Sequence, residues 1–99
     1  MKVIDGVYYS IDPQEASLVF EVKWMPYGPA HYEERLYRQK KAGRQFFIYG
    51  SGGPDSPYGQ NGKVGWDIKP VAFDVAVLWA VRNGIQLDSL AKAFKEASV

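Results

Sequence analysis

The stretch Arg44-Gln-Phe-Phe-Ile-Tyr-Gly-Ser-Gly-Gly-Pro54 decides the fold of this chain. Its aromatic part, residues 46–49, predicts a strand, because aromatic and β-branched side chains suit a pleated, half-buried surface. Residues 50–65 then hold six of the ten glycines and two of the six prolines. A domain of 99 residues rarely carries so long an irregular segment without a use for it. We therefore predict that this loop is displayed for recognition.

The segment upstream of the aromatic strand fits two structures. Glu34 and Arg38 lie four residues apart, which suits a helix over 31–41 capped by Gly43. Alternatively, residues 35–38 form a strand that turns at 41–43 and pairs with residues 46–49. The short glycine-containing connection favours the hairpin. Alternation along residues 46–49 then leaves one aromatic face of the sheet for a helix, a partner chain or a ligand.

The rest of the chain is predicted to form short strands, one helical turn and two helices. We expect a strand over 3–11 with an Asp5-Gly6 turn near its start, one helical turn near 13–17 that begins at Asp12, a strand over 18–25 and a short strand over 66–69 that Pro70 stops. Leu18, Phe20, Val22 and Trp24 share one face of the second of these strands. Two helices follow, over 73–83 with Gly84 as its cap and over 88–97.

These elements predict one α+β domain over residues 1–99. We expect an antiparallel sheet of four to five strands with two C-terminal helices packed on one face. An apolar content of 46% supplies enough core material to make disorder improbable. The helix over 73–83 is apolar nearly all round, so it is either deeply buried or shares a side with a partner, for example in a homodimer.

The composition also bears on compartment and chemistry. Cysteine is absent, and neither a signal peptide nor an apolar run of about 20 residues is visible, so we expect a cytoplasmic protein without membrane contact. His31 is the only histidine, which makes a metal or catalytic site improbable. Residues 50–53 lack the following helix and lysine of a phosphate loop. We expect no catalytic residues, no metal and no cofactor.

Basic residues cluster beside the aromatic strand. Five of the twelve lysines and arginines fall within residues 35–44, where no acidic residue interrupts them. Such a cluster attracts phosphates or an acidic protein surface, and neighbouring aromatic rings could stack on bases. The candidate binding residues are Arg35, Tyr37, Arg38, Lys40, Lys41, Arg44, Phe47, Tyr49 and Tyr58. The alternatives are a solvated hairpin tip and aromatic side chains that belong to the core.

Several short motifs together resemble a group of small uncharacterised proteins of phages and integrative mobile elements of gut Firmicutes. The motifs are Leu36-Tyr37-Arg38, Lys41-Ala42-Gly43, Phe46-Phe47-Ile48-Tyr49-Gly50, Gly52-Gly53-Pro54, Gly59-Gln60-Asn61, Ile68-Lys69-Pro70 and Ala76 with Trp79. The resemblance implies a strand over 34–39, which supports the hairpin, and it implies no activity.

The expected function follows from the missing catalytic set, the spare aromatic face and the resemblance. We expect a non-enzymatic accessory protein of a phage or mobile element that binds another protein. An inhibitor of a host defence complex, of the anti-CRISPR type, is one form of this hypothesis. The alternative is a nucleic-acid-binding regulator that uses the basic hairpin over 35–44 or the C-terminal helix pair.

Overall fold

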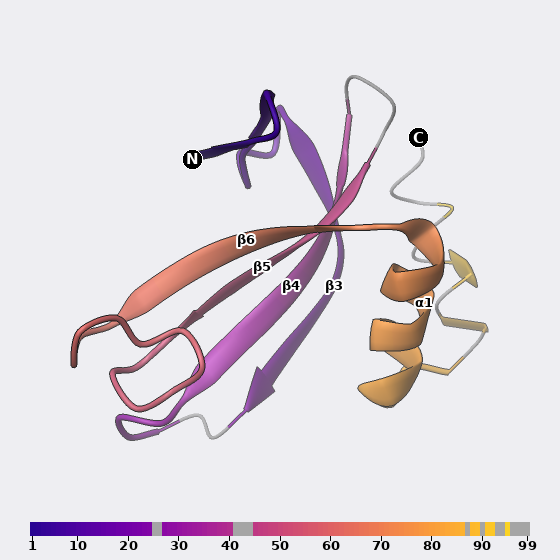
Figure 1. The fold of residues 1–99 in the computed structure, drawn as a ribbon. Coiled ribbons are helices and arrows are strands. Elements are labelled where there is room, and N and C mark those ends of the chain that lie inside the picture. The colour runs from indigo at the N-terminus through magenta and orange to yellow at the C-terminus, as the bar shows by residue number, and fades with distance from the viewer. Residues whose placement is uncertain (25–26, 41–44, 87, 90, 93–94, 96–99) are drawn as a thin grey trace.

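The computed structural model describes residues 1–24, 27–40, 45–86, 88–89, 91–92 and 95. Its elements follow one another as β1 (Lys2–Ile4), β2 (Val7–Tyr9), β3 (Ala16–Trp24), β4 (Tyr32–Gln39), β5 (Phe46–Gly52), β6 (Gly65–Val71) and α1 (Phe73–Arg82). Strands β3 to β6 form one antiparallel sheet in chain order, and β1 pairs with β2 in a separate hairpin. Figure 1 shows the long, twisted sheet with α1 near one end and a loop at the other. The expected α+β class is confirmed.

The aromatic strand pairs as the hairpin hypothesis predicts. β4 and β5 are antiparallel, with Leu36 opposite Ile48 and Tyr37 opposite Phe47. The helical alternative for this segment is therefore wrong. Residues 41–44, where the turn is expected, lie outside the described residues.

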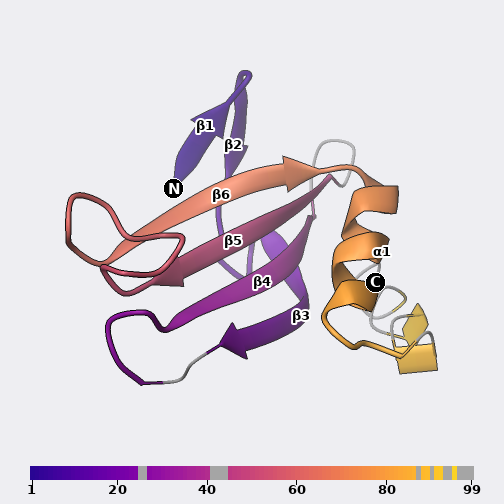
Figure 2. The ribbon, with the colours of Figure 1, turned by 60° about the horizontal axis from the view of Figure 1, so that its bottom comes forward.

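The two faces of the sheet carry separate cores. Leu36, Phe46 and Ile48 pack with Val19 and with Ala76 of α1 on one face. On the other face, a second core lies between the sheet and the N-terminal hairpin, which Figure 2 shows on the opposite side of the sheet from α1. Its buried members are Tyr9, Ala16, Tyr37, Phe47 and Ile68. The predicted alternation along residues 46–49 is confirmed. The face expected to be left for a helix, a partner chain or a ligand is covered by the chain's own N-terminal hairpin.

The N-terminal segment is a hairpin rather than one strand over 3–11. Asp5 and Gly6 have φ angles of 51° and 80°, and they separate β1 from β2. Two residues with positive φ are the signature of the type I′ turn, whose twist matches that of the flanking strands. The Asp-Gly pair therefore ends the first strand, and the chain folds back to cover the sheet.

The expected turn after this hairpin is present as a single hydrogen-bonded turn. The carbonyl of Asp12 accepts from the backbone N–H groups of Glu15 and Ala16, at 2.8 and 3.0 Å. The Asp12 carboxylate accepts from the N–H of Gln14 at 2.9 Å. β3 begins directly afterwards.

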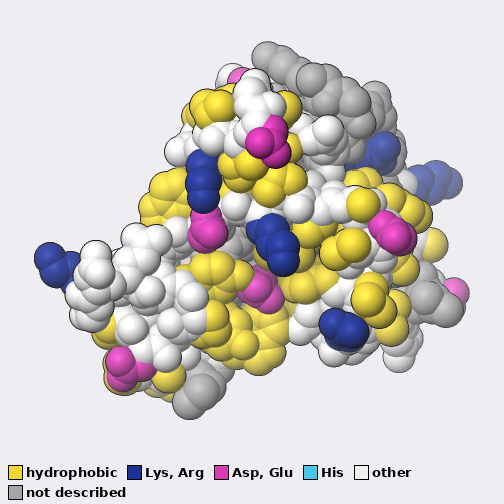
Figure 3. Space-filling model, in the orientation of Figure 1, with side chains coloured by type: hydrophobic (Ala, Val, Ile, Leu, Met, Phe, Trp, Pro, Cys, Tyr) yellow, Lys and Arg dark blue, Asp and Glu magenta, His cyan; other side chains and the backbone are white. Residues whose placement is uncertain are grey.

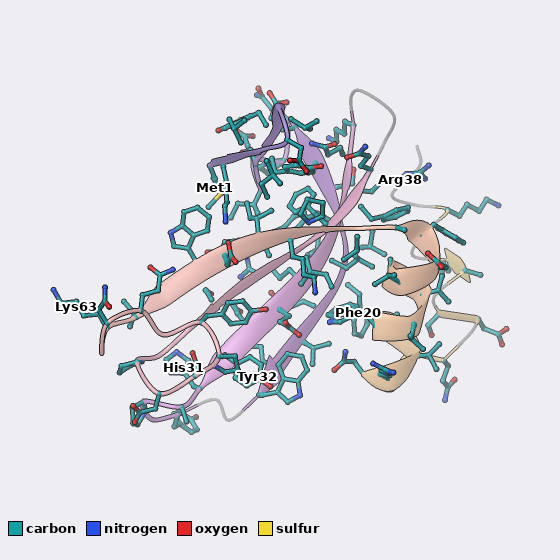
Figure 4. All side chains as sticks on the ribbon, in the orientation of Figure 1. Met1, Phe20, His31, Tyr32, Arg38 and Lys63 are labelled. Atoms are coloured by element: carbon teal, nitrogen blue, oxygen red, sulfur yellow. The ribbon has the colours of Figure 1, made fainter. Side chains whose placement is uncertain are left out.

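A β-bulge divides the expected apolar face of β3. The register shifts between Leu18, which pairs with Tyr37, and Phe20, which pairs with Leu36. Neighbouring residues of β4 point to opposite faces, so Leu18 and Phe20 do too. The prediction that they share a face is wrong: Leu18 is 50% exposed, whereas Phe20 points toward α1 (Figure 4).

Pro70 does not stop the last strand. β6 runs to Val71, and Pro70 pairs with Phe47 in its register. β6 is an edge strand of the sheet, where a residue without a backbone N–H is tolerated on the open side. The prediction of a strand that ends at residue 69 is therefore wrong.

Helix α1 ends close to its predicted position. It spans Phe73–Arg82 with no side-chain cap at Ala72, and Gly84 has a φ of 82°, as a left-handed terminal glycine requires. Half of the residues of the second predicted helix, over 88–97, lie outside the described residues. Within the described part of the chain, no helix has the length and apolar character needed to span a bilayer.

Candidate functional site

The glycine loop, defined as residues 53–64, lies against its own sheet. Gly50 of β5 provides the space for the Tyr58 ring, because a β-carbon on Gly50 would overlap that ring. A β-carbon on Gly53 would overlap the carbonyl of Pro29 in the same way. The backbone N–H of Asp55 donates to the same carbonyl at 2.8 Å. Gly50 and Gly53 thus allow the first part of the loop to pack against the rest of the domain, whereas residues 60–64 are exposed, and its display for recognition stays a prediction.

A carboxylate on β4 joins the loop to the helix. Glu34 accepts hydrogen bonds from the Tyr58 hydroxyl and from Trp79 Nε1, the latter at 3.2 Å. A cleft of about 250 Å³ opens beside this carboxylate, between the sheet and α1. Hydrogen bonds to this one side chain thus connect β4, the glycine loop and α1.

Burial and the neighbouring Glu34 carboxylate both disfavour the phenolate of Tyr58, so they raise the pKa of Tyr58 well above its ordinary value. An unfolded tyrosine loses its proton near pH 10, whereas folded Tyr58 keeps it. Above that pH the unfolded state binds fewer protons, so the free energy of unfolding must fall as the pH rises. Urea denaturation between about pH 9 and about pH 11 should show this fall, and Tyr58→Phe should reduce its slope. Equal slopes in the two proteins would contradict the assignment.

The structure separates the predicted basic candidates. Arg35 forms ion pairs with Glu21 at 2.7 Å and Glu33 at 3.2 Å, on the face of the N-terminal hairpin. Arg38 lies over the ring of Phe46, which belongs to the other face, at 5.3 Å from its centroid. Lys40 Nζ donates to the carbonyl of Pro13. Lys41 and Arg44 lie outside the described residues.

The predicted aromatic candidates are also divided. Phe47 is fully buried and Tyr37 is 6% exposed, so both belong to the core. Tyr49 is partly buried, with its ring 6.2 Å from that of Trp66. Tyr58 fills the space over Gly50. Two of the described candidates line depressions of the surface: Tyr49 a hollow at the loop end of the sheet, and Tyr58 the cleft beside Glu34.

We define the sheet-end hollow as two adjoining depressions of about 340 and 270 Å³ that share His31 and Ser51. They lie where the loop after β3, the start of β4, the end of β5 and the start of β6 meet. Figure 4 places His31 and Tyr32 at this end of the sheet and Arg38 at the other. The lining residues are Lys23, Trp24, Tyr27, His31, Tyr32, Glu33, Tyr49, Ser51, Gly52, Val64, Gly65 and Trp66.

The rim of the hollow is aromatic and apolar. Tyr27 is 88% exposed, Val64 is 72% exposed and Trp66 is 38% exposed. Inside the rim, Trp24 and Tyr32 stack at 4.7 Å between ring centroids. Trp66 also contacts Tyr49, which packs against the core under the N-terminal hairpin.

The polar groups of the hollow are held in place. Arg35 and Ser51 both donate to one oxygen of Glu33, at 3.2 and 3.4 Å. A hydrogen bond with Tyr37, together with the neighbouring carboxylates, raises the pKa of the Arg35 guanidinium. Nδ1 of His31 lies 2.7 Å from the backbone carbonyl of Gly28, and this hydrogen bond orients the ring. The hollow therefore offers oriented polar groups inside an apolar rim.

This arrangement suits binding. Among the described residues, no group of three or more His, Cys, Asp or Glu side chains could hold a metal ion. Sequence reasoning missed Tyr27, Val64 and Trp66, because only the paired strand ends bring them together. A partial signal was present in Asn61-Gly62, whose φ angles of 53° and 73° mark a second type I′ turn. That pair could have indicated a loop that folds back.

Comparison with known proteins leaves the function to be inferred from this geometry. The chain matches no protein-family model, no curated protein and no solved structure.

Proposed function

We propose that this protein is a non-enzymatic binding protein that holds a partner protein in the sheet-end hollow. The observation that carries the proposal is the concave site itself, with Tyr27, Val64 and Trp66 exposed around a polar floor. Protein interfaces place tyrosine and tryptophan at the residues that contribute most to binding. A rim of this composition fits a partner's apolar side chains.

The floor of the hollow supports specificity for a partner that presents a hydrogen-bond donor. The Glu33 carboxylate is an acceptor that Arg35 and Ser51 orient, and the His31 ring is oriented by its hydrogen bond with the carbonyl of Gly28. Groups that are already oriented lose little entropy on binding, so their hydrogen bonds contribute more to affinity. The partner surface that suits this site is therefore apolar with a few polar groups at its centre.

On the basis of the resemblance described above, we propose that this activity serves a phage or mobile element in the cytoplasm of its host. An inhibitor that docks onto a host defence complex, as an anti-CRISPR protein does, is one form of the proposal. A domain of 99 residues with a pre-formed site is large enough for such an inhibitor, because one standard interface needs about 800 Å² on each partner.

Nucleic-acid binding has less support from the geometry. Arg35 is engaged by two carboxylates, and Arg38 stacks on a ring of the opposite core. A strip of phosphates would need these cations on one surface. Tyr37 and Phe47, which would have to stack on bases, are buried.

The test is affinity purification from the cells in which the protein is made. Wild type, Tyr27→Ala/Trp66→Ala and the control Leu18→Ala are tagged and compared by quantitative mass spectrometry. We expect one protein that wild type and the control retain equally and that the double variant loses. Each interface aromatic contributes about 2 kcal/mol or more, so the affinity should fall at least about 100-fold. Equal retention by all three proteins would contradict the proposal.

A further inference from the structure

Helix α1 exposes an apolar stripe with a charge at each end. Val75, Leu78 and Val81 are 45%, 49% and 46% exposed, although they are large aliphatic residues. Asp74 lies in the first turn and Arg82 in the last, on the same side of the helix. Figure 3 shows hydrophobic side chains gathered over α1 on the face turned to the viewer.

The stripe is complementary to its own reversed copy about Leu78. Val75 and Val81 lie three residues to either side, and Asp74 and Arg82 lie four residues to either side with opposite charge. The buried side of the helix has the same symmetry, because Ala76 and Ala80 are both fully buried against the rest of the molecule. A surface that matches itself when reversed is what a two-fold interface needs.

We propose that a second copy of this chain docks on this stripe, with the two α1 helices antiparallel and Leu78 at the two-fold axis. Val75 then packs against Val81 of the second copy, and Asp74 faces Arg82 of the second copy. Two-fold symmetry repeats each of these contacts. Valine and leucine side chains allow two helices to pack with their axes about 8–10 Å apart.

The charges specify this arrangement over a parallel one. Among the described residues, neither Asp74 nor Arg82 has an ion-pair partner in its own chain. In an antiparallel pair each finds the opposite charge, and the opposed helix dipoles add to the attraction. A parallel pair would bring like charges together.

The size of the surface predicts a weak dimer. Ten residues of helix are about 15 Å long, so the stripe alone buries less than the roughly 800 Å² per partner of a stable interface. We therefore expect self-association that depends on concentration. The sheet-end hollow lies at the other end of the sheet, as Figure 1 shows for the loop and α1, so a dimer leaves it open. This inference is independent of the proposed partner.

The test is analytical ultracentrifugation of the full chain from micromolar to millimolar concentration. Asp74→Arg places two arginines together at each end of the stripe, so we expect dimer dissociation to become about tenfold easier. Adding Arg82→Asp restores the opposite charges in reversed order, so the double variant should recover most of the lost affinity. Leu78→Asp should be monomeric, with the circular dichroism spectrum of the wild type.

Three results would overturn the proposal. The first is a wild-type protein that stays monomeric at millimolar concentration. The second is a double variant that dimerises no better than Asp74→Arg, which would show that residues 74 and 82 do not meet. The third is a Leu78→Asp variant that dimerises as well as the wild type, because another surface must then be used.

Discussion

Replacing Phe47 with alanine is expected to lower the free energy of unfolding by about 3–5 kcal/mol. Phe47 is fully buried at the centre of the core under the N-terminal hairpin. Its ring stacks on Tyr37 at 5.3 Å and meets Tyr9 edge-on at 5.4 Å. The substitution leaves a cavity that both tyrosines border, and Tyr9 also holds the hairpin to the sheet. Because small domains are stable by only about 5–15 kcal/mol, much of the margin would be lost.

Urea denaturation followed by circular dichroism measures this effect. Leu18→Ala is the matched control, because Leu18 is an aliphatic residue of the same sheet that is 50% exposed. We expect the control to change the stability by about 0.5 kcal/mol or less. A loss of less than about 1 kcal/mol for Phe47→Ala would show that this face of the sheet is not the core described here.

Gly50→Ala should destabilise the protein by about 1–3 kcal/mol, although alanine is normally the better residue in regular structure. The added methyl group overlaps the Tyr58 ring, which must then move off the sheet. The movement breaks the hydrogen bond between Tyr58 and Glu34 and exposes a partly buried ring. The glycine loop loses its main contact with β5.

A double-mutant cycle separates this mechanism from a general effect of alanine in a strand. In a Tyr58→Ala background the overlapping ring is gone, so Gly50→Ala should cost close to nothing or become slightly favourable. The two substitutions should therefore be strongly non-additive. Additive effects on the midpoint of urea denaturation would mean that the loop does not lie on the sheet at Gly50.

Sequence reasoning predicts correctly those parts of the fold that depend on local patterns of residues. The alternation of residues 46–49 predicts that their side chains point to both faces of the sheet, and the hairpin with residues 35–38 follows from the short connection. Gly84 marks the end of α1 because a left-handed terminal glycine needs only its own helix. Each of these inferences depends on residues close together in the chain.

The errors concern contacts between distant segments. The bulge after Leu18 reverses the face of one residue, and no local pattern reveals it. Pro70 is tolerated because β6 is an edge strand, which depends on the order of strands in the sheet. The close approach of Tyr58 to Gly50 and of Pro29 to Gly53 was not predicted either, because each pair is distant in the sequence.

The candidate site was the least predictable part. Strand alternation alone puts Arg35 and Arg38 on opposite faces, which already argued against one basic surface. The sheet-end hollow instead gathers side chains from four separate segments, such as Tyr27, Ser51 and Trp66. Sequence spacing carries no information on such a meeting, because it depends on where the strands end.

Site-specific photo-crosslinking tests the central claim, that the sheet-end hollow binds a partner protein, most directly. A benzophenone amino acid is placed at Val64 on the rim or at Leu18, which is also exposed but lies on β3 away from the hollow. After irradiation in the cells in which the protein is made, we expect position 64 to capture one defined protein and position 18 to capture none. Excess unlabelled wild type should suppress the crosslink, whereas Tyr27→Ala/Trp66→Ala should not. Capture of the same protein from position 18, or of no protein from position 64, would contradict the claim.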